Sequence, residues 1–164
     1  MIFFDLASVE SEDYELDIKR INLTNILQEE ILALYESFES RGFEPVINII
    51  DKPIFIMGDK DSLERIVDNL LSNALKYAEG DIKINLEEAS GKGVLSISNS
   101  CTTLGKEDVA HIFDRFYMAD QVRKGQGVGL GLSIVKSLIE KMNGNITAKL
   151  EDDELFIICQ WKVI

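Results

Sequence analysis

One predicted helix constrains this chain more than any other stretch: residues 61–78, DSLERIVDNLLSNALKYA. Its apolar residues recur at three- and four-residue spacing, which predicts an amphipathic α-helix with one buried face. Those residues are Leu63, Ile66, Val67, Leu70, Leu71, Ala74 and Ala78. Asn69, Asn73 and Lys76 lie along one edge of that face, with Tyr77 between them and the core. Amide oxygens beside a cation suit a hydrated Mg²⁺ bound to phosphates. The alternative is an ordinary amphipathic helix whose asparagines are solvated.

A glycine-rich stretch, Gly125–Ser133 (GQGVGLGLS), leads directly into a second apolar periodic segment that ends near Met142. Glycine lets the backbone approach a ligand closely. A helix that begins there points its free N–H groups and positive dipole end at an anion. The stretch is neither a Walker A loop nor a GxGxxG motif. Taken alone, it is also consistent with a flexible linker ahead of a helix.

Three segments in order carry a family resemblance: NLLSNALKY (Asn69–Tyr77), IFDRFY (Ile112–Tyr117) and GVGLGLSIVK (Gly127–Lys136). They resemble the N, F and G2 boxes of the bacterial sensor histidine kinases, which share a superfamily with gyrase, Hsp90 and MutL. The FDRFY and LGLSIVK wording favours a histidine kinase over the other branches. The resemblance covers roughly residues 15–164. It implies a catalytic domain that binds Mg-ATP and donates the terminal phosphate to a histidine on a separate dimerisation domain.

The pattern of periodic segments and turns predicts an α+β two-layer domain. Helices are expected near residues 26–40, 61–78 and 107–113, and from the glycine-rich stretch to Met142. Asn22 or Thr24 is expected to cap the first helix and Gly42 to end it. Strands are expected near residues 15–23, 46–50, 54–57, 82–86, 94–98, 146–150 and 154–163, with residues 90–93 as a hairpin loop.

The resemblance implies the Bergerat ATP-binding fold for this domain. That fold has a mixed five-stranded core sheet with three main helices on one face, and its other face is open to water. Residues 15–164 are expected to form the ATP-binding domain. Residues 1–14 are similar to a remnant of a dimerisation-hairpin helix and linker, or they form a weakly packed tail.

The resemblance also assigns roles to individual residues. Asn73 would ligate Mg²⁺, with Asn69 supporting the ion and its water shell, and Lys76 and Arg115 would contact the phosphates. Asn69, Lys76 and Arg115 are therefore the expected catalytic residues. Tyr77 would pack on the nucleotide or in the core. The alternative for Arg115 is a salt bridge with Asp114 or a neighbour.

The remaining expected nucleotide contacts are Leu104, Gly127, Val128, Gly129, Leu130, Gly131 and Leu132. Phe113 and Phe116 would be packing hinges for a flexible ATP lid that lies between Phe116 and Gly127. The lid sequence has little apolar content, so we expect it to be mobile until nucleotide orders it.

The strand after residue 94 departs from the family pattern. Most relatives continue it into a G1 box of the form DxGxG, whose Asp accepts a hydrogen bond from the adenine amino group. Here the corresponding run is Asn99, Ser100, Cys101, Thr102 and Thr103. The Asn99 amide oxygen can still accept that bond. A neutral acceptor contributes about 1 kcal/mol against about 1.5–3 for a charged one. ATP binding is then expected to be about tenfold weaker, at micromolar or weaker affinity.

Length and charge exclude several other classes of protein. A chain of 164 residues suits one domain with a proper core. The net charge of −12 makes nucleic acid and anionic membrane surfaces poor partners. Cys101 and Cys159 show no paired spacing, which favours a reducing cytoplasm. No apolar run is long enough to cross a bilayer. The resemblance implies a membrane-bound parent whose partners are its own dimerisation domain and, indirectly, a response regulator.

The phosphoacceptor is not visible in this sequence. His111 is the only histidine, and it lies just before the F box and outside any phosphoacceptor context. The fragment is therefore expected to bind nucleotide without autophosphorylating. One alternative function is a degenerate, non-enzymatic module that serves as an interaction scaffold, which the altered G1 box favours. Another is an ATPase or serine kinase of the same superfamily, which Asn69 opposes because gyrase-like relatives carry a carboxylate there.

Overall fold

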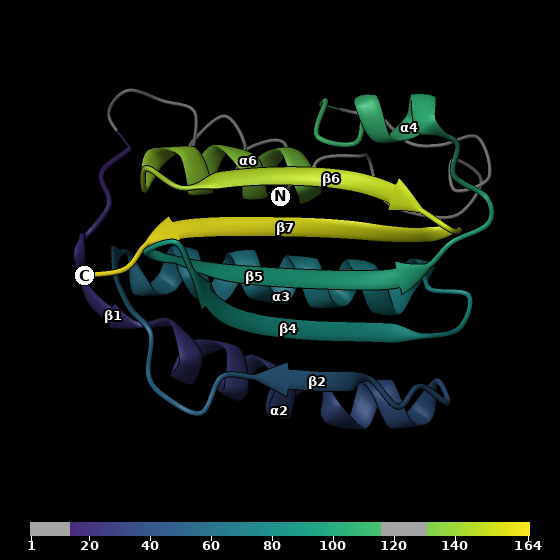
Figure 1. Ribbon diagram of the computed structural model, residues 1–164, viewed down its shortest axis with the longest axis horizontal. Coiled ribbons are helices and arrows are strands. Elements are labelled where there is room, and N and C mark those ends of the chain that lie inside the picture. Colours follow the sequence, from purple (N-terminus) through teal and green to yellow (C-terminus); the bar gives the residue numbers. More distant parts are fainter. Residues whose placement is uncertain (1–13, 116–130) are drawn as a thin grey trace.

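A computed structural model of the chain describes residues 14–115 and 131–164. Its core is a five-stranded sheet in the order β2-β4-β5-β7-β6 (Figure 1). These strands are β2 Val46–Ile49, β4 Ile82–Ala89, β5 Lys92–Ser100, β6 Asn145–Glu151 and β7 Glu154–Lys162. β2 runs parallel to β4, and the other neighbours are antiparallel. The predicted mixed five-stranded sheet is therefore confirmed.

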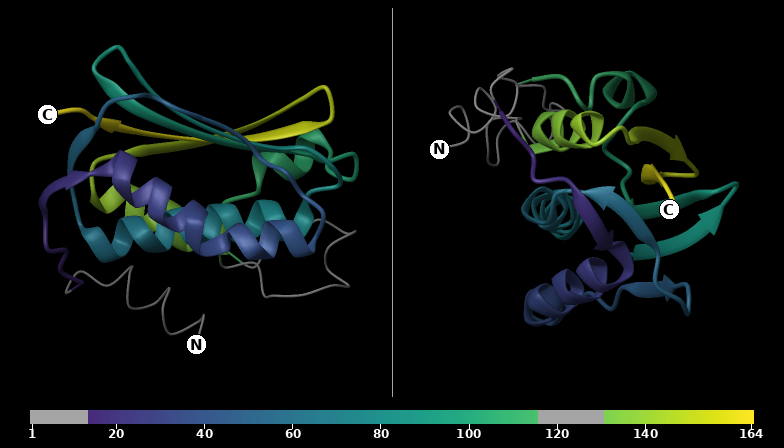
Figure 2. Two further views of the ribbon diagram at one scale, coloured as in Figure 1. Left: turned by 90° about the horizontal axis from the view of Figure 1, so that it is seen from below. Right: turned by 90° about the vertical axis from the view of Figure 1, so that its left-hand side faces the viewer.

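Three helices, α2 Leu23–Ser40, α3 Lys60–Tyr77 and α6 Gly131–Lys141, cover one face of this sheet (Figure 2). α3 lies between the other two and packs on both. The short helix α4, Lys106–Ala110, lies beyond the end of β5. The predicted α+β two-layer sandwich is confirmed. The helix expected near residues 107–113 is shorter, because its backbone passes into turns at His111.

The helix that the sequence placed at the centre of the fold forms as expected. Its apolar face is buried against the sheet and against α2 and α6. The buried residues of α3 are Ser62, Leu63, Ile66, Val67, Leu70, Leu71, Ala74 and Leu75. Fully burying a Leu or Ile side chain contributes about 1.5–3 kcal/mol. This face therefore fixes how α3 rotates about its axis, and so fixes which edge presents the asparagines.

Side-chain N-caps define where α2 and α3 begin. Asn22 caps α2, since its amide oxygen accepts the N–H of Asn25 at 3.1 Å. The alternative cap, Thr24, is wrong; its hydroxyl accepts the N–H of Ile54 at 2.9 Å and so ties α2 to the segment before β3. Asp59 caps α3 by accepting the N–H of Ser62 at 2.8 Å.

The Asp59 carboxylate also accepts the Asp17 backbone N–H at 2.8 Å. Burial acts to raise the pKa of Asp59, but the N–H donors of Ser62 and Asp17 outweigh it and hold the pKa below its ordinary value. The ionised cap is therefore the form that stabilises the fold.

Some strand boundaries differ from the prediction. The strand expected over residues 15–23 is confined to β1, Lys19–Asn22, which pairs antiparallel with β3, Phe55–Gly58, in a separate two-stranded sheet. The loop expected at residues 90–93 is a two-residue turn, because Ser90 (φ 53°) and Gly91 (φ 75°) both adopt left-handed conformations. As a result β4 and β5 are each longer than expected.

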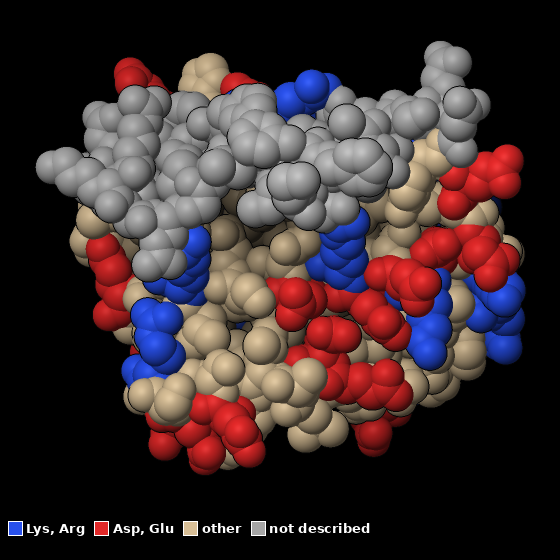
Figure 3. Space-filling model, turned by 180° about the vertical axis from the view of Figure 1, so that it is seen from behind, with Lys and Arg blue, Asp and Glu red and all other residues tan. Residues whose placement is uncertain are grey.

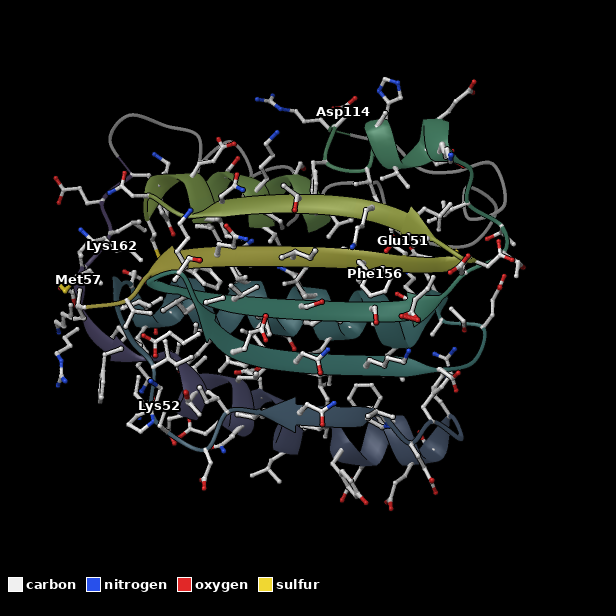
Figure 4. All side chains as sticks on the ribbon, viewed as in Figure 1. Lys52, Met57, Asp114, Glu151, Phe156 and Lys162 are labelled. Atoms are coloured by element: carbon white, nitrogen blue, oxygen red, sulfur yellow. The ribbon has the colours of Figure 1, made fainter. Side chains whose placement is uncertain are left out.

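The face of the sheet opposite the helices carries a shallow trough of about 600 Å³. Phe156, on β7, lies on this face (Figure 4), and half-buried Val94 and Ile158 line the trough beside it. The Lys149 ammonium sits 5.1 Å from the centre of the Phe156 ring. No described helix covers this face.

Candidate functional site

The predicted polar edge of α3 forms in the structure. Asn69 and Asn73 are half-buried, and within the described part of the chain neither amide makes a hydrogen bond. The Lys76 ammonium lies 5.3 Å from the centre of the Tyr77 ring and is exposed. No carboxylate of the described residues lies within ion-pairing distance of it. Two amides and one cation on a single edge are thus available to a ligand.

The end of β5 is joined to the end of α3 by backbone hydrogen bonds. The Glu79 N–H donates to the Ser100 carbonyl oxygen at 3.2 Å, and the Ser100 N–H donates to the Asp81 carbonyl oxygen at 3.0 Å. Asn99, one residue before Ser100, lies on the helix-covered face of the sheet and is only 7% exposed. The structure therefore brings Asn99 to the same end of the domain as the C-terminal end of α3, although Asn99 follows Tyr77 by 22 positions in the sequence.

The Asn99 side chain has a defined orientation. Its amide nitrogen donates to the Ser100 carbonyl oxygen at 3.1 Å. Its amide oxygen accepts no hydrogen bond from the described residues. The neighbouring Ser100 hydroxyl is buried without a partner in the same part of the chain. A buried amide with an unused acceptor fits a ligand that carries an N–H or NH₂ donor.

The loop after Asn99 is held rigidly, which the sequence did not reveal. The Glu79 carboxylate accepts both the Thr102 backbone N–H at 2.7 Å and the Thr102 hydroxyl at 2.8 Å. The Cys101 N–H donates to the Asp153 carbonyl oxygen at 2.7 Å, and its thiol lies 3.6 Å from the Thr103 hydroxyl. These contacts brace the loop, for which the family resemblance implies glycines. Glu79 is thus a residue of this site that sequence analysis missed, because its partner is 23 positions away.

α6 packs on α3 on the side away from α2, and the F-box segment lies beside α6. Phe113 packs partly buried against the core, and the Lys136 ammonium of α6 lies 5.8 Å from its ring centre. Leu104 and Leu132 also pack against the core. Gly131 begins α6, and a Cβ there would meet nothing within 4 Å. Packing therefore does not require glycine at this position.

His111 lies just before the F-box segment and Arg115 lies within it, and both side chains are exposed. Asp114 pairs with His111, with 2.8 Å between the carboxylate oxygen and Nδ1. Asp114 is labelled at the top of Figure 4. Gly127, Val128, Gly129 and Leu130 lie outside the described residues, as does the expected lid between Phe116 and Gly127. Their assigned contacts and the expected lid mobility remain predictions.

Acidic side chains gather on the helical face of the molecule (Figure 3). Glu30 on α2 is partly buried beside them. Its pKa is raised above the ordinary value, mainly by burial and further by the negative charges of Asp68, Glu64 and Glu29. A polyanion approaching α3 meets this negative surface, so local cations such as Lys76 must offset it.

The donor set fits Mg²⁺ together with a nucleotide. Among residues 14–115 and 131–164, no group of three His, Cys, Asp or Glu side chains could hold a metal ion. Mg²⁺ is commonly held through few protein oxygens plus substrate phosphates and water. The unpartnered amides of Asn69 and Asn73 suit that arrangement, and Lys76 provides the cation beside it.

Comparison with known proteins identifies the family. Residues 58–160 match the family model described as "Histidine kinase-, DNA gyrase B-, and HSP90-like ATPase". The sensor histidine kinase YcbM of Bacillus subtilis is 36% identical over 151 residues, which cover 90% of this chain and 49% of that protein. The sensor histidine kinase WalK of Bacillus subtilis is 31% identical over 149 residues, which cover 87% of this chain and 24% of WalK. The chain thus spans half or less of these relatives.

Solved structures show the same fold. The catalytic domain of the histidine kinase ThkA superposes with a TM-score of 0.78 at 24% identity, covering 90% of this chain and 96% of that domain. Full-length ShkA, solved with AMPPNP, gives 0.84 at 20% identity, covering 99% of this chain and 34% of ShkA. In the described residues no helix has both the length and the apolar character needed to cross a membrane. The chain belongs to the histidine kinase-, DNA gyrase B- and HSP90-like ATPase family, as a catalytic ATP-binding domain of the sensor histidine kinase type.

Proposed function

We propose that this domain binds Mg-ATP between α3 and the start of α6, and donates the terminal phosphate to a histidine on a separate dimerisation domain. The observation that carries the proposal is the edge of α3. There, two half-buried amides and one ammonium lie together without hydrogen-bond or ion-pair partners in the described part of the chain, at the end of the domain that Asn99 also occupies. The sensor kinases among the relatives support a histidine as the phosphoacceptor.

Each residue would have a limited task, because phosphoryl transfer depends mainly on positioning and charge stabilisation. Asn73 would hold Mg²⁺ through its amide oxygen, and Asn69 would orient the ion's water shell. Lys76 and Arg115 would contact the phosphates as donors. Asn99 would accept the adenine amino group. When Mg-ATP is bound, ATP would supply the phosphoryl group and Mg²⁺ would neutralise part of the charge on the phosphates.

Gly131 and Leu132 would begin a helix whose first N–H groups face the phosphates. Gly127, Val128, Gly129 and Leu130 would bring backbone to the same place, and Leu104 and Tyr77 would contact the nucleotide. The acceptor histidine would come from the dimerisation domain of the longer parent, and a response regulator would then receive the phosphate. One structural relative, ThkA, was solved in complex with its response regulator TrrA.

The test is a calorimetric titration with Mg-ATP, followed by incubation with a dimerisation hairpin and labelled ATP. We expect Mg-dependent binding and an acid-labile phosphohistidine on the hairpin. Asn73→Ala should weaken Mg-ATP binding at least about tenfold and reduce its metal dependence, since the variant loses one ligand of the ion. Unchanged affinity and unchanged metal dependence in this variant would refute the proposed site.

A degenerate scaffold is the second candidate, and the G1 segment favours it. Cys101 and Thr103 fill that loop where relatives have glycines, and Glu79 braces it. No heat of binding at millimolar nucleotide and no label would support the scaffold. Acid-stable phosphoserine or free hydrolysis would instead support a serine kinase or ATPase of the same superfamily.

A further inference from the structure

A second cavity lies on the other side of α3 from α6. It has a volume of about 1030 Å³ and is bounded by the C-terminal half of α2, residues 41–45, β2 and the turn after α3. Its apolar wall includes Tyr35, Phe43 and Ile47. We name it the α2–β2 groove.

Two exposed apolar side chains line this groove. Seven large apolar side chains of the described residues are exposed. Two of them, Tyr35 (50% exposed) and Ile47 (41%), line the groove itself. Leu32 precedes Tyr35 by one helical turn and so lies on the same side of α2. Scattered exposed apolar residues are ordinary on a protein surface, but a group of them beside a cavity indicates a docking surface.

The rim of the groove is negatively charged. Glu39, Glu44 and Asp81 line it, and within the described residues their carboxylates form no ion pair or hydrogen bond. The single cation of the lining is Arg41, whose guanidinium lies 5.9 Å from the centre of the Phe43 ring. Carboxylates without counter-ions around an apolar wall are complementary to a cationic partner that also carries apolar side chains.

The groove borders a free sheet edge. β2 is the outermost strand of the five-stranded sheet and pairs only with β4 among the described strands (Figure 2). The Ile50 N–H donates to Leu86 on β4, so Val46 and Asn48 also face β4. The N–H and C=O groups of Ile47 and Ile49 therefore point away from the sheet. An extended peptide could pair with them as an added strand.

Other surfaces specify a partner less clearly. In the trough on the outer face of the sheet, Glu88 already pairs with Lys52, and Lys149 covers Phe156. Its charges are therefore largely balanced within the molecule. A second copy of the chain would bring another acidic rim to the α2–β2 groove, which like-charge repulsion opposes.

We propose that the α2–β2 groove docks an extended cationic segment of a partner protein, one whose groove-facing side chains include both cations and apolar groups. The segment would pair with the free edge of β2, place its apolar side chains against Tyr35 and Ile47, and set its cations opposite Glu39, Glu44 and Asp81. Glu79 lines the groove and also braces the loop after Asn99, so the groove borders the proposed nucleotide site, but its test needs no nucleotide.

The test uses three fluorescein-labelled nonapeptides of the pattern XXYYXXYYX, so that both residue types face the groove when the peptide pairs as a strand. X and Y are lysine and phenylalanine, lysine and serine, or glutamate and phenylalanine. Anisotropy titrations should show the lysine–phenylalanine peptide binding at least about tenfold tighter than either of the others. The double variant Glu39→Lys/Glu44→Lys and the single variant Tyr35→Ala should each weaken it about tenfold or more. Glu140→Lys/Glu151→Lys is the matched control, because it makes the same charge change on exposed side chains of α6 and β6.

Hydrogen exchange on the unmodified chain gives a second readout that does not depend on any variant. Bound lysine–phenylalanine peptide should slow exchange of the Ile47 and Ile49 amides. Equal binding of the lysine–serine peptide, equal loss in the control variant, or unprotected β2 amides would each overturn the proposal. A dimer of the unmodified chain that Tyr35→Ala dissolves would assign the groove to a second copy, and would overturn it too.

Discussion

Asn99 offers the sharpest test of the proposed nucleotide site. In the structure its amide nitrogen is occupied by the Ser100 carbonyl oxygen at 3.1 Å, so the amide oxygen is the group left for a ligand. An acceptor at this point would bind the amino group of adenine. Asn99→Ala removes the acceptor and leaves that amino group unsatisfied in a buried place. We expect a loss of about 1.4 kcal/mol, which is about a tenfold rise in the Kd for ATP.

The fold should tolerate this substitution. The Ser100 carbonyl oxygen loses the Asn99 amide but keeps the Glu79 N–H at 3.2 Å, so no buried acceptor is orphaned. One lost hydrogen bond costs about 1 kcal/mol. For a domain of this size, that corresponds to a fall of about 2–4 °C in Tm. Thermal unfolding followed by circular dichroism therefore checks that the variant remains folded.

The matched control is a change of ligand. Purine riboside triphosphate lacks the 6-amino group, so its binding should be insensitive to Asn99→Ala, while ATP binding weakens. Calorimetric titrations of both nucleotides against both proteins measure the difference. Equal weakening of the two nucleotides would show that the substitution acts through the loop and not through the base. Unchanged ATP affinity would show that Asn99 does not contact adenine.

Asn99→Asp tests the same contact by replacing the neutral acceptor with a charged one. A charged acceptor gains about 1 kcal/mol over a neutral one, but it gives up the N–H donated to Ser100, which is worth about the same. We therefore expect an ATP affinity within about threefold of the unmodified chain. A gain of tenfold or more would show that the bond to Ser100 contributes nothing to the orientation of this side chain.

Four further substitutions test other parts of the structure. A Cβ on Gly144 would lie 2.7 Å from the Trp161 ring, so Gly144→Ala should cost about 1–3 kcal/mol in chemical denaturation. A Cβ on Gly131 would meet nothing within 4 Å, so Gly131→Ala should leave the free energy of unfolding intact while weakening Mg-ATP binding. A loss of stability equal to that of Gly144→Ala would refute the assigned packing. Asp59→Asn should lower Tm at neutral pH. Because the folded pKa of Asp59 is lowered, its contribution is present above about pH 4 and is lost as the pH falls through the folded pKa; a Tm difference that persists at pH 2 would contradict this. Glu30→Gln should raise Tm by about 1–2 °C at pH 7 and by nothing near pH 3, because the folded pKa of Glu30 is raised; a gain at pH 3 would rule out this cause.

The sequence determined those features that depend on local spacing. The three- and four-residue period of α3 set its buried face, and with it the edge that carries Asn69, Asn73 and Lys76. Gly42, with a φ of 76°, ends α2 as expected because few other residues adopt that conformation. The motif wording identified the family, and the family model then confirmed it.

The tertiary structure decided everything that depends on contacts between distant segments. Thr24 and Asn22 are both residue types that commonly cap helices. Only the folded structure shows that the Thr24 hydroxyl instead accepts the Ile54 N–H. Glu79 braces Thr102, and Ser100 orients Asn99, through hydrogen bonds that no local pattern encodes. The edge position of β2, and thus the α2–β2 groove, follows from strand order. Side-chain periodicity reports which face of an element is buried, whereas pairing order and hydrogen-bond partners depend on the whole folded chain.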